Sequence, residues 1–227
     1  FSSLFLGEYK KWLLQSSWNI WNMPTASKKK ERNYMEYKTI RIVDKQYPEK
    51  LKKIYAPPEQ LHIMGNENIL NQKSIAIIGC RECSTYGANL ARKFSYELSK
   101  IGINIISGLA RGIDTYAHLG TIIAKRRTIA VLGSGLDKIY PSENKKICEE
   151  IIKNDGAIIT EFPLGTKPEK INFPIRNRII SGLSNGILVI EAKEKSGTLI
   201  TVEYGLEQGK NIFVVPREYN KQIFEWN

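Results

Sequence analysis

The sequence predicts an α/β protein with an extended Rossmann-like fold, in which a doubly wound and mostly parallel sheet forms the core. Six short runs rich in β-branched residues begin at Ser74, and stretches with helical periodicity separate them. Strands that alternate with helices in this way form parallel sheets covered by helices on both faces. A length of 227 residues suffices for one such core and a smaller flanking unit.

The predicted elements follow one another in a regular order. The expected strands are SIAIIG (74–79), INIISG (103–108), TIAVLGSG (128–135), GAIITE (156–161), GILVIEA (186–192) and NIFVVP (211–216). The expected helices run from about Tyr86 to Lys100, through Asp114 and His118, from about Ser142 to Asn154, and from about Thr198 to Glu207. Right-handed crossovers place the strand-to-helix turns along one edge of the sheet.

The segments outside this series differ in composition. Residues 1–34 hold three of the four tryptophans and a basic linker, so we expect an atypical N-terminal extension with an amphipathic helix. Its aromatic side chains either dock on the core or stack on bases. Residues 35–73 contain Pro48, Pro57 and Pro58, which predict a proline-rich, extended arm with one helical turn. The Rossmann-like domain then spans 74–216, and 217–227 form a C-terminal tail.

The overall charge favours a polyanionic partner. Lys and Arg total 34 against 23 Asp and Glu, a net charge of +11, although a basic, solvated surface explains the same surplus. Three cysteines do not make a disulfide framework. No apolar run approaches the roughly 18 residues of a membrane span, and the first residues lack the basic start of a signal peptide. We therefore expect a cytoplasmic protein without membrane contact.

Two glycine-rich turns are expected at the carboxyl ends of the first two strands, where an open parallel sheet binds anionic ligands. The turn IIGCRECSTYG offers Gly79 for close backbone approach and the guanidinium of Arg81. The turn ISGLARGID offers Ser107, Gly108 and Arg111. Neither turn has the dinucleotide spacing GxGxxG, so NAD binding is not expected and no cofactor is predicted.

A third cluster, FPIRNRIISGLS, is expected at the start of a helix. It contains Phe173, Arg176, Asn177 and Arg178. Two arginines at a helix N-terminus are unfavourable unless an anion lies nearby. The arginines therefore contact a phosphate, or they pair with structural carboxylates.

A fourth cluster, EKSGTLITVEYGLEQG, follows the fifth strand. Ser196, Gly197 and Thr198 are expected to open a helix whose first N–H groups are free to bind an anion. Glu203 lies more than one turn into this helix, where it either faces the site or pairs with an arginine.

Other reactive residues do not form a recognisable catalytic or metal site. Cys80 and Cys83 have the C-x-x-C spacing of a redox pair, but ordinary side chains at a tight turn fit it as well. Zinc needs four ligands, and no second paired motif supplies them. Asp114 and His118 share a helix face, yet no nucleophile is placed beside them. We expect no metal and no enzymatic activity.

Taken in order, these clusters resemble the DprA/Smf family of DNA-processing proteins over residues 45–216. The longest motifs are IIGCRECSTYG, ISGLARGIDTYAHLG, TIAVLGSGLDKIYPSEN and EFPLGTKPEKINFPIRNRIISGLSNGILVIEAKEKSGTLITVEYGLEQGKNIFVVP. The resemblance implies a homodimer that binds and protects incoming single-stranded DNA and loads the RecA recombinase in natural transformation. It implies that a basic pocket for this DNA is lined by Gly79, Arg81, Ser107, Gly108, Arg111, Phe173, Arg176, Asn177 and Arg178.

Some features leave other functions open. Cys80 stands where the family usually has serine or threonine. The stretch SGTLITVE is similar to the GGxGTxxE motif of LOG-type phosphoribohydrolases, whose glutamate assists cleavage of a nucleoside monophosphate. A nucleotide phosphoribohydrolase is therefore the alternative function, and a Rossmann protein that senses a small nucleotide is a third.

Overall fold

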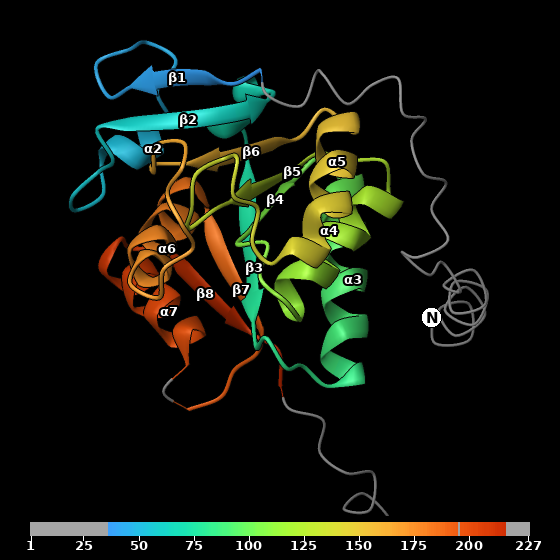
Figure 1. The fold of residues 1–227 in the computed structure, drawn as a ribbon. Coiled ribbons are helices and arrows are strands. Elements are labelled where there is room, and N and C mark those ends of the chain that lie inside the picture. The colour runs from blue at the N-terminus through green and yellow to red at the C-terminus, as the bar shows by residue number, and fades with distance from the viewer. Residues whose placement is uncertain (1–35, 195, 217–227) are drawn as a thin grey trace, which may run out of the picture. The chain divides into compact units, whose positions relative to one another are not determined.

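The computed structural model describes residues 36–194 and 196–216. These residues form an eight-stranded sheet in the order β1-β2-β6-β5-β4-β3-β7-β8 (Figure 1). The strands are β1 (Lys38–Arg41), β2 (Gln60–Gly65), β3 (Ser74–Gly79), β4 (Asn104–Ser107), β5 (Thr128–Val131), β6 (Ala157–Thr160), β7 (Gly186–Glu191) and β8 (Asn211–Val214). From β6 to β8 all neighbours are parallel, whereas β1 and β2 add to the sheet in antiparallel pairing.

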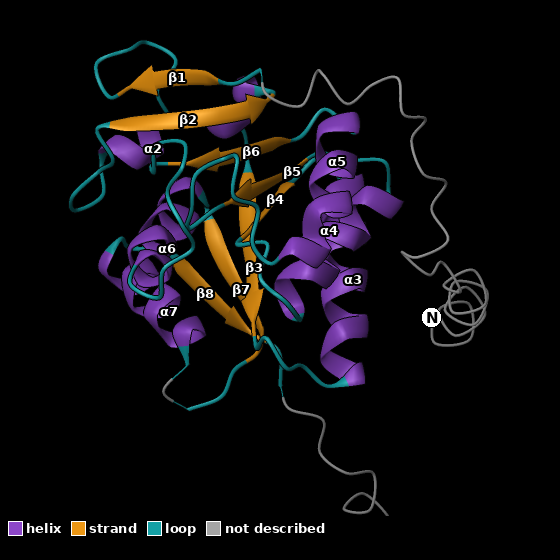
Figure 2. Cartoon of the chain, viewed as in Figure 1, coloured by secondary structure: helices purple, strands orange, loops and turns teal. Residues whose placement is uncertain are grey.

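Helices cover both faces of this sheet (Figure 2). On one face lie α3 (Thr85–Lys100), α4 (Ile113–Ile123) and α5 (Lys145–Lys153), and on the other lie α2 (Glu49–Lys52), α6 (Asn172–Leu183) and α7 (Gly197–Glu207). Short 3-10 turns span Glu67–Asn71 and Ser142–Asn144. The central strands are buried at every position of β4, β5 and β6, as expected for a parallel sheet between two helical layers.

The chain reverses its direction of winding at β3. This strand pairs with β4 on one side and with β7 on the other, so the chain leaves in one direction and returns on the opposite side. A crevice opens at the carboxyl ends of the strands at such a topological switch point, and ligands of open α/β sheets bind there. A ligand site is therefore expected at the carboxyl ends of β3 and β7.

The predicted fold class is confirmed. The six predicted strands form at 74–79, 104–107, 128–131, 157–160, 186–191 and 211–214, with helices between them. The proline-rich arm contains two short helical segments, α2 and the 3-10 turn Glu67–Asn71, where one helical turn was predicted. The strands β1 and β2 also form there and join the sheet beside β6. No helix in the described ranges is long and apolar enough to cross a membrane. The expected N-terminal extension and C-terminal tail lie outside the described residues.

Candidate nucleic-acid interface

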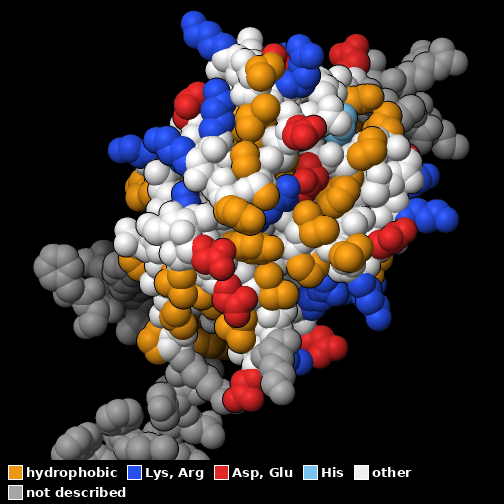
Figure 3. Space-filling model, turned by 90° about the vertical axis from the view of Figure 1, so that its left-hand side faces the viewer, with side chains coloured by type: hydrophobic (Ala, Val, Ile, Leu, Met, Phe, Trp, Pro, Cys, Tyr) orange, Lys and Arg blue, Asp and Glu red, His pale blue; other side chains and the backbone are white. Residues whose placement is uncertain are grey.

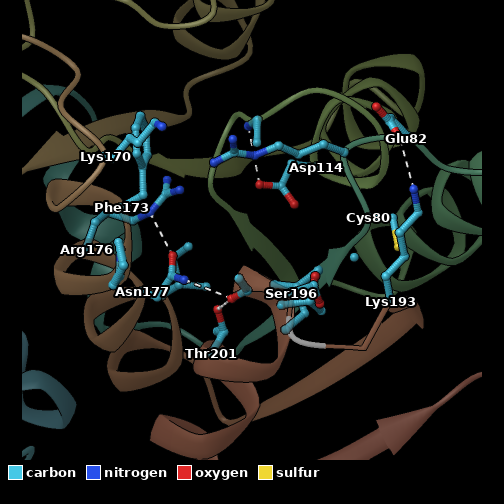
Figure 4. A pocket seen from close by; sticks show the side chains of 18 of the residues that line it. Cys80, Glu82, Asp114, Lys170, Phe173, Arg176, Asn177, Lys193, Ser196 and Thr201 are labelled. Carbon is cyan, nitrogen blue, oxygen red and sulfur yellow. Dashed lines mark hydrogen bonds and ion pairs between the residues drawn. The ribbon is translucent and has the colours of Figure 1, made fainter.

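A cavity of about 710 Å³ opens at the carboxyl ends of β3 and β7, at the switch point. Segments far apart in the sequence meet there: the turn after β3, the start of α4, the loop before α6 with the first turns of α6, and the turn into α7 (Figure 4). Among the described residues that line it are Gly79, Arg81, Glu82, Asp114, Tyr140, Lys170, Phe173, Arg176, Asn177, Lys193, Ser196, Gly197 and Thr198. A volume of this order accommodates a nucleotide-sized group.

Arg176 forms the buried base of the cavity. Its Nη1 donates to the carbonyl oxygen of Gly108 at 2.6 Å and to that of Val131, at the ends of β4 and β5. Its Nε donates to Oδ1 of Asn177 at 3.1 Å. Burial lowers the pKa of Arg176 to about 10, while Asp114 opposes this shift, so the guanidinium is charged at neutral pH. Arg176 therefore ties strand ends together and gives the floor a positive charge.

The Asp114 carboxylate is the buried counter-charge. Its Oδ2 accepts hydrogen bonds from the backbone N–H groups of Gly108 and Ala110, at 3.1 and 3.3 Å. Burial raises the pKa of Asp114, and the Arg176 guanidinium partly opposes that rise. The carboxylate thus orders the turn after β4, in addition to partly neutralising the cavity floor.

The N-terminus of α7 faces the cavity with unsatisfied polar groups. The side chain of Asn177 donates to the carbonyl oxygen of Gly197 at 3.2 Å and fixes this turn against α6 (Figure 4). Oγ of Ser196 is buried and has no hydrogen-bond partner among the described residues. The first N–H groups of an α-helix also lack intrahelical acceptors and favour anions. This corner is therefore suited to bind a phosphate.

An aromatic side chain and an arginine stand at the mouth. The guanidinium carbon of Arg81 lies 5.4 Å from the ring centroid of Phe173, within the range of a cation–π contact. The rings of Phe173 and Tyr140 lie 5.8 Å apart. In the ranges 36–194 and 196–216, no carboxylate lies within ion-pair distance of Arg81 or Lys170. Both cations are exposed and available to a ligand.

The comparison with protein families identifies the chain. A family model described as DNA recombination-mediator protein A matches residues 38–225. The chain belongs to this family. The DNA processing protein DprA of Bacillus subtilis is 45% identical over 78% of the chain, and that of Streptococcus pneumoniae is 40% identical over 82%. The chain spans 60% and 65% of the length of these two relatives.

Solved structures of the DNA recombination-mediator protein A family share the fold. The DprA structure from Streptococcus pneumoniae superimposes with a TM-score of 0.77 at 39% identity, covering 83% of this chain and 66% of that one. The DprA structure from Helicobacter pylori gives 0.74 at 31% identity, covering 82% and 83%. The Helicobacter protein is described as having a unique single-stranded DNA binding mode.

Eight of the twelve residues predicted for the site line the cavity. They are Gly79, Arg81, Phe173, Arg176, Asn177, Ser196, Gly197 and Thr198. Gly108 and Arg111 instead line a cavity of about 30 Å³ that shares Arg81, Tyr140 and Phe173 with the larger one. The sequence clusters therefore meet at the carboxyl ends of the strands, as a parallel sheet requires.

The second glycine-rich turn has a mainly structural position. A Cβ atom at Gly108 would lie 2.5 Å from Nη1 of Arg176, so glycine leaves room for the buried guanidinium. The buried hydroxyl of Ser107 donates to the carbonyl oxygen of Ile77 at 2.7 Å and does not line the cavity. Arg111 is exposed and pairs with Glu143 at 2.5 Å. Contact between these side chains and DNA stays a prediction.

Arg178 is not among the described residues that line the cavity, and it has a carboxylate partner. Its two terminal nitrogens donate to the two carboxylate oxygens of Glu161, at 2.5 and 2.6 Å. Its Nε donates to the carbonyl oxygen of Ala56 at 3.0 Å. Of the two interpretations of the arginine pair, the structural carboxylate therefore holds for Arg178, while Arg176 lies in the cavity.

Two lysines of the cavity do not appear among the predicted site residues. Lys170 lies before α6, and Lys193 follows β7 and pairs with Glu82 at 2.8 Å. Lysines are frequent in exposed loops, so neither stood out. The position of Lys170 three residues before Phe173, next to the third cluster, was the one available signal.

The structure also places the other candidate reactive side chains, which are those of Glu203, His118, Cys80 and Cys83. Glu203 is exposed and is not among the described residues that line the cavity. His118 is fully buried, and burial lowers its pKa to about 3. Burial also raises the pKa of Cys80 and Cys83, with Glu191 contributing to both shifts. A raised pKa disfavours the reactive thiolate.

Proposed function

We propose that the protein binds single-stranded DNA in the cavity at the carboxyl ends of β3 and β7. The observation that carries this proposal is one nucleotide-sized cavity that combines an aromatic ring, a helix N-terminus and exposed cations. These cations have no ion-pair partner within the part of the chain that the structure describes. Arg81 and Lys170 supply charge at the mouth, and the α7 N-terminus supplies free amide groups beside the buried Oγ of Ser196. The single-stranded DNA binding described for the Helicobacter pylori relative supports it.

The mechanism is electrostatic, with stacking added. Guanidinium, ammonium and amide groups replace the counterions of the backbone phosphates, and the released counterions drive binding. Phe173, already in contact with Arg81, offers a face on which one base stacks. Phosphates carry no sequence information, so we expect weak sequence preference. Four neutralised phosphates give a log–log salt slope near −3, at about −0.7 each.

The first test is Arg81→Ala, assayed by the anisotropy of labelled dT oligomers across a salt series. We expect the affinity to fall about tenfold, because a charge-assisted contact is lost. The salt slope should become shallower by about 0.7. Arg126→Ala is the matched control, since Arg126 is exposed in the turn before β5. This turn lies at the amino ends of the parallel strands, opposite the cavity. Wild-type binding by Arg81→Ala would reject the cavity as the DNA site.

A direct assay distinguishes DNA binding from the alternative function, a phosphoribohydrolase activity. A phosphoribohydrolase would release free base from nucleoside monophosphates, and it would need a glutamate at the reacting bond. Glu203, the residue suggested by the motif, does not line the cavity, which favours binding over hydrolysis. Release of base that disappears in Glu203→Gln would instead establish the enzyme. Tight mononucleotide binding that is indifferent to DNA length would establish the nucleotide sensor.

At the level of the cell, we infer the role that the family resemblance implies. The protein would act in the cytoplasm as a homodimer, protect incoming single-stranded DNA during natural transformation, and load the RecA recombinase onto it. The DprA proteins of Bacillus subtilis and Streptococcus pneumoniae, at 45% and 40% identity, support this role. RecA filament formation on DNA pre-coated with a single-strand-binding protein tests it.

A further inference from the structure

We propose that Tyr55 is a stacking platform for the strand after it leaves the cavity, so that the bound DNA runs from Phe173 across the first turn of α6 to the turn before β2. This inference rests on the proposed function, because it extends the same DNA path. It assigns a binding role to a segment that the cavity does not include. Contacts to the carbonyl oxygens of Ala56 and Pro58 hold the backbone of the turn that carries Tyr55.

Tyr55 is held on a stiff and strained turn. Its side chain is 93% exposed, and the next residue, Ala56, has a φ of 51°, which is unusual for a residue other than glycine. Two prolines follow, and the hydroxyl of buried Tyr47 donates to the carbonyl oxygen of Pro58 at 2.6 Å. Backbone strain of this kind persists only where surrounding contacts hold it, and it concentrates at ligand-binding positions.

Arg178 joins this turn to the helix that lines the cavity. The guanidinium donates to the carbonyl oxygen of Ala56 at 3.0 Å and to that of Ile175, in α6, at 2.9 Å. The guanidinium also forms a bidentate ion pair with the carboxylate of Glu161. The backbone next to Tyr55 is therefore fixed relative to α6, the helix that carries Phe173. An ordered platform loses little conformational entropy on binding.

The surface between the cavity and the turn suits a single strand. Ile171 and Ile175, one helical turn apart, are 67% and 37% exposed. Lys170 lies at the cavity end of this path, and Lys53 is exposed next to the turn. Figure 3 views the molecule from the side that carries α6 and shows hydrophobic side chains spread among charged ones. Apolar faces beside lysines match bases and phosphates, respectively.

The other side of the cavity is less favourable to a polyanion. Glu82 and Glu194 are exposed there, and Lys193 is already paired with Glu82. Glu191 accepts from the backbone N–H of Ser84 at 2.9 Å, at the start of α3. Tyr86 in the first turn of α3 is 38% exposed, but a strand would have to pass these carboxylates to reach it. The Glu82 and Glu194 carboxylates therefore disfavour a DNA path on this side of the cavity.

The test compares Tyr55→Ala with wild type on dT oligomers of about 4 to 16 nucleotides, the range that one single-strand-binding fold covers. Tyr55→Ala should weaken binding of the longest oligomers about five- to tenfold, near the low end of what one stacked base contributes. The shortest oligomers, which fill only the cavity, should bind unchanged. Tyr55→Phe should match wild type because it keeps the ring, and Tyr86→Ala is the matched control. Strands with abasic sites should bind wild type and Tyr55→Ala equally.

The outcomes separate this inference from the proposed function. If Tyr55→Ala binds all lengths as wild type does while Arg81→Ala is impaired, the platform is wrong and the cavity stands. If both variants bind as wild type does, the proposed site fails, and the platform fails with it. The inference would also be overturned if Tyr55→Ala weakened the binding of abasic strands as much as that of intact strands, because the contact would then not be stacking. Substitution at a 93% exposed side chain should leave the fold intact, and thermal unfolding of the variant verifies this.

Discussion

Individual side chains at the cavity hold the surrounding strands together, and Arg176 shows this most clearly. Its guanidinium is buried against two backbone carbonyls, close to the carboxylate of Asp114. A buried charge of this kind is stabilising only while its partners are present. Arg176 therefore stabilises the base of the cavity, above which exposed residues such as Arg81 lie.

Removing Arg176 should destabilise the protein. We expect Arg176→Ala to lower the free energy of unfolding by about 3 kcal/mol, because Asp114 is left as an uncompensated buried charge. Asp114→Asn in the same chain should recover part of the loss. Urea denaturation of the single and double variants measures both effects, with Arg126→Ala as the control. Unchanged stability combined with lost DNA binding would make Arg176 a direct ligand and contradict the structural role.

At the scale of elements, the turns that carry the cavity residues interlock. The N-cap of α4, Gly112, has a φ of 72° and a ψ of −130°. A Cβ atom there would lie 2.2 Å from the carbonyl oxygen of Cys80 and 2.4 Å from that of Arg81. Glycine thus lets the start of α4 pack against the turn that positions the Arg81 side chain.

We expect Gly112→Ala to disturb both stability and binding. The Cβ clash is with backbone and adds to the strain of a positive φ, so the loss should be about 2 kcal/mol or more. The displaced Arg81 should also weaken dT binding. Gly209→Ala is the control, since Gly209 has a φ of 65° and a Cβ atom there would meet nothing within 4 Å. Equal losses in the two variants, by thermal unfolding, would show that only φ matters.

Sequence patterns located the strands of the parallel sheet well and the interactions between elements poorly. Runs such as SIAIIG are bounded by turns and are buried on both faces, so their composition alone identifies them. The strands β1 and β2 were not predicted, because the segment between them is rich in proline. Arg178 could not be distinguished from Arg176, because its partner Glu161 comes close only when α6 folds against the end of β6.

At the scale of the whole molecule, the described sheet ends in an exposed edge. The last strand, β8, pairs with β7 on one side, and Phe213 and Val214 are 52% and 67% exposed. Open edges with apolar side chains are sites of association. This edge is therefore a candidate surface for the homodimer that the family resemblance implies.

We expect Val214→Lys to shift the protein from dimer to monomer in sedimentation velocity. A charged side chain at the centre of an apolar interface is desolvated without a partner, which is unfavourable. Val43→Lys is the matched control, because Val43 is 79% exposed between β1 and α2, at the other end of the strand order. A wild-type monomer, or a Val214→Lys dimer, would exclude this edge as the interface.

The pairing of β3 with β7 determines when the cavity can exist during biosynthesis. One wall comes from the turn after β3 and another from the turn after β7, which is translated much later. Contacts between such distant segments form late, because closing the long intervening loop costs entropy. A nascent chain that has not yet emerged from the ribosome through α7 therefore has no complete pocket. A ligand of this cavity therefore cannot bind before the domain has folded.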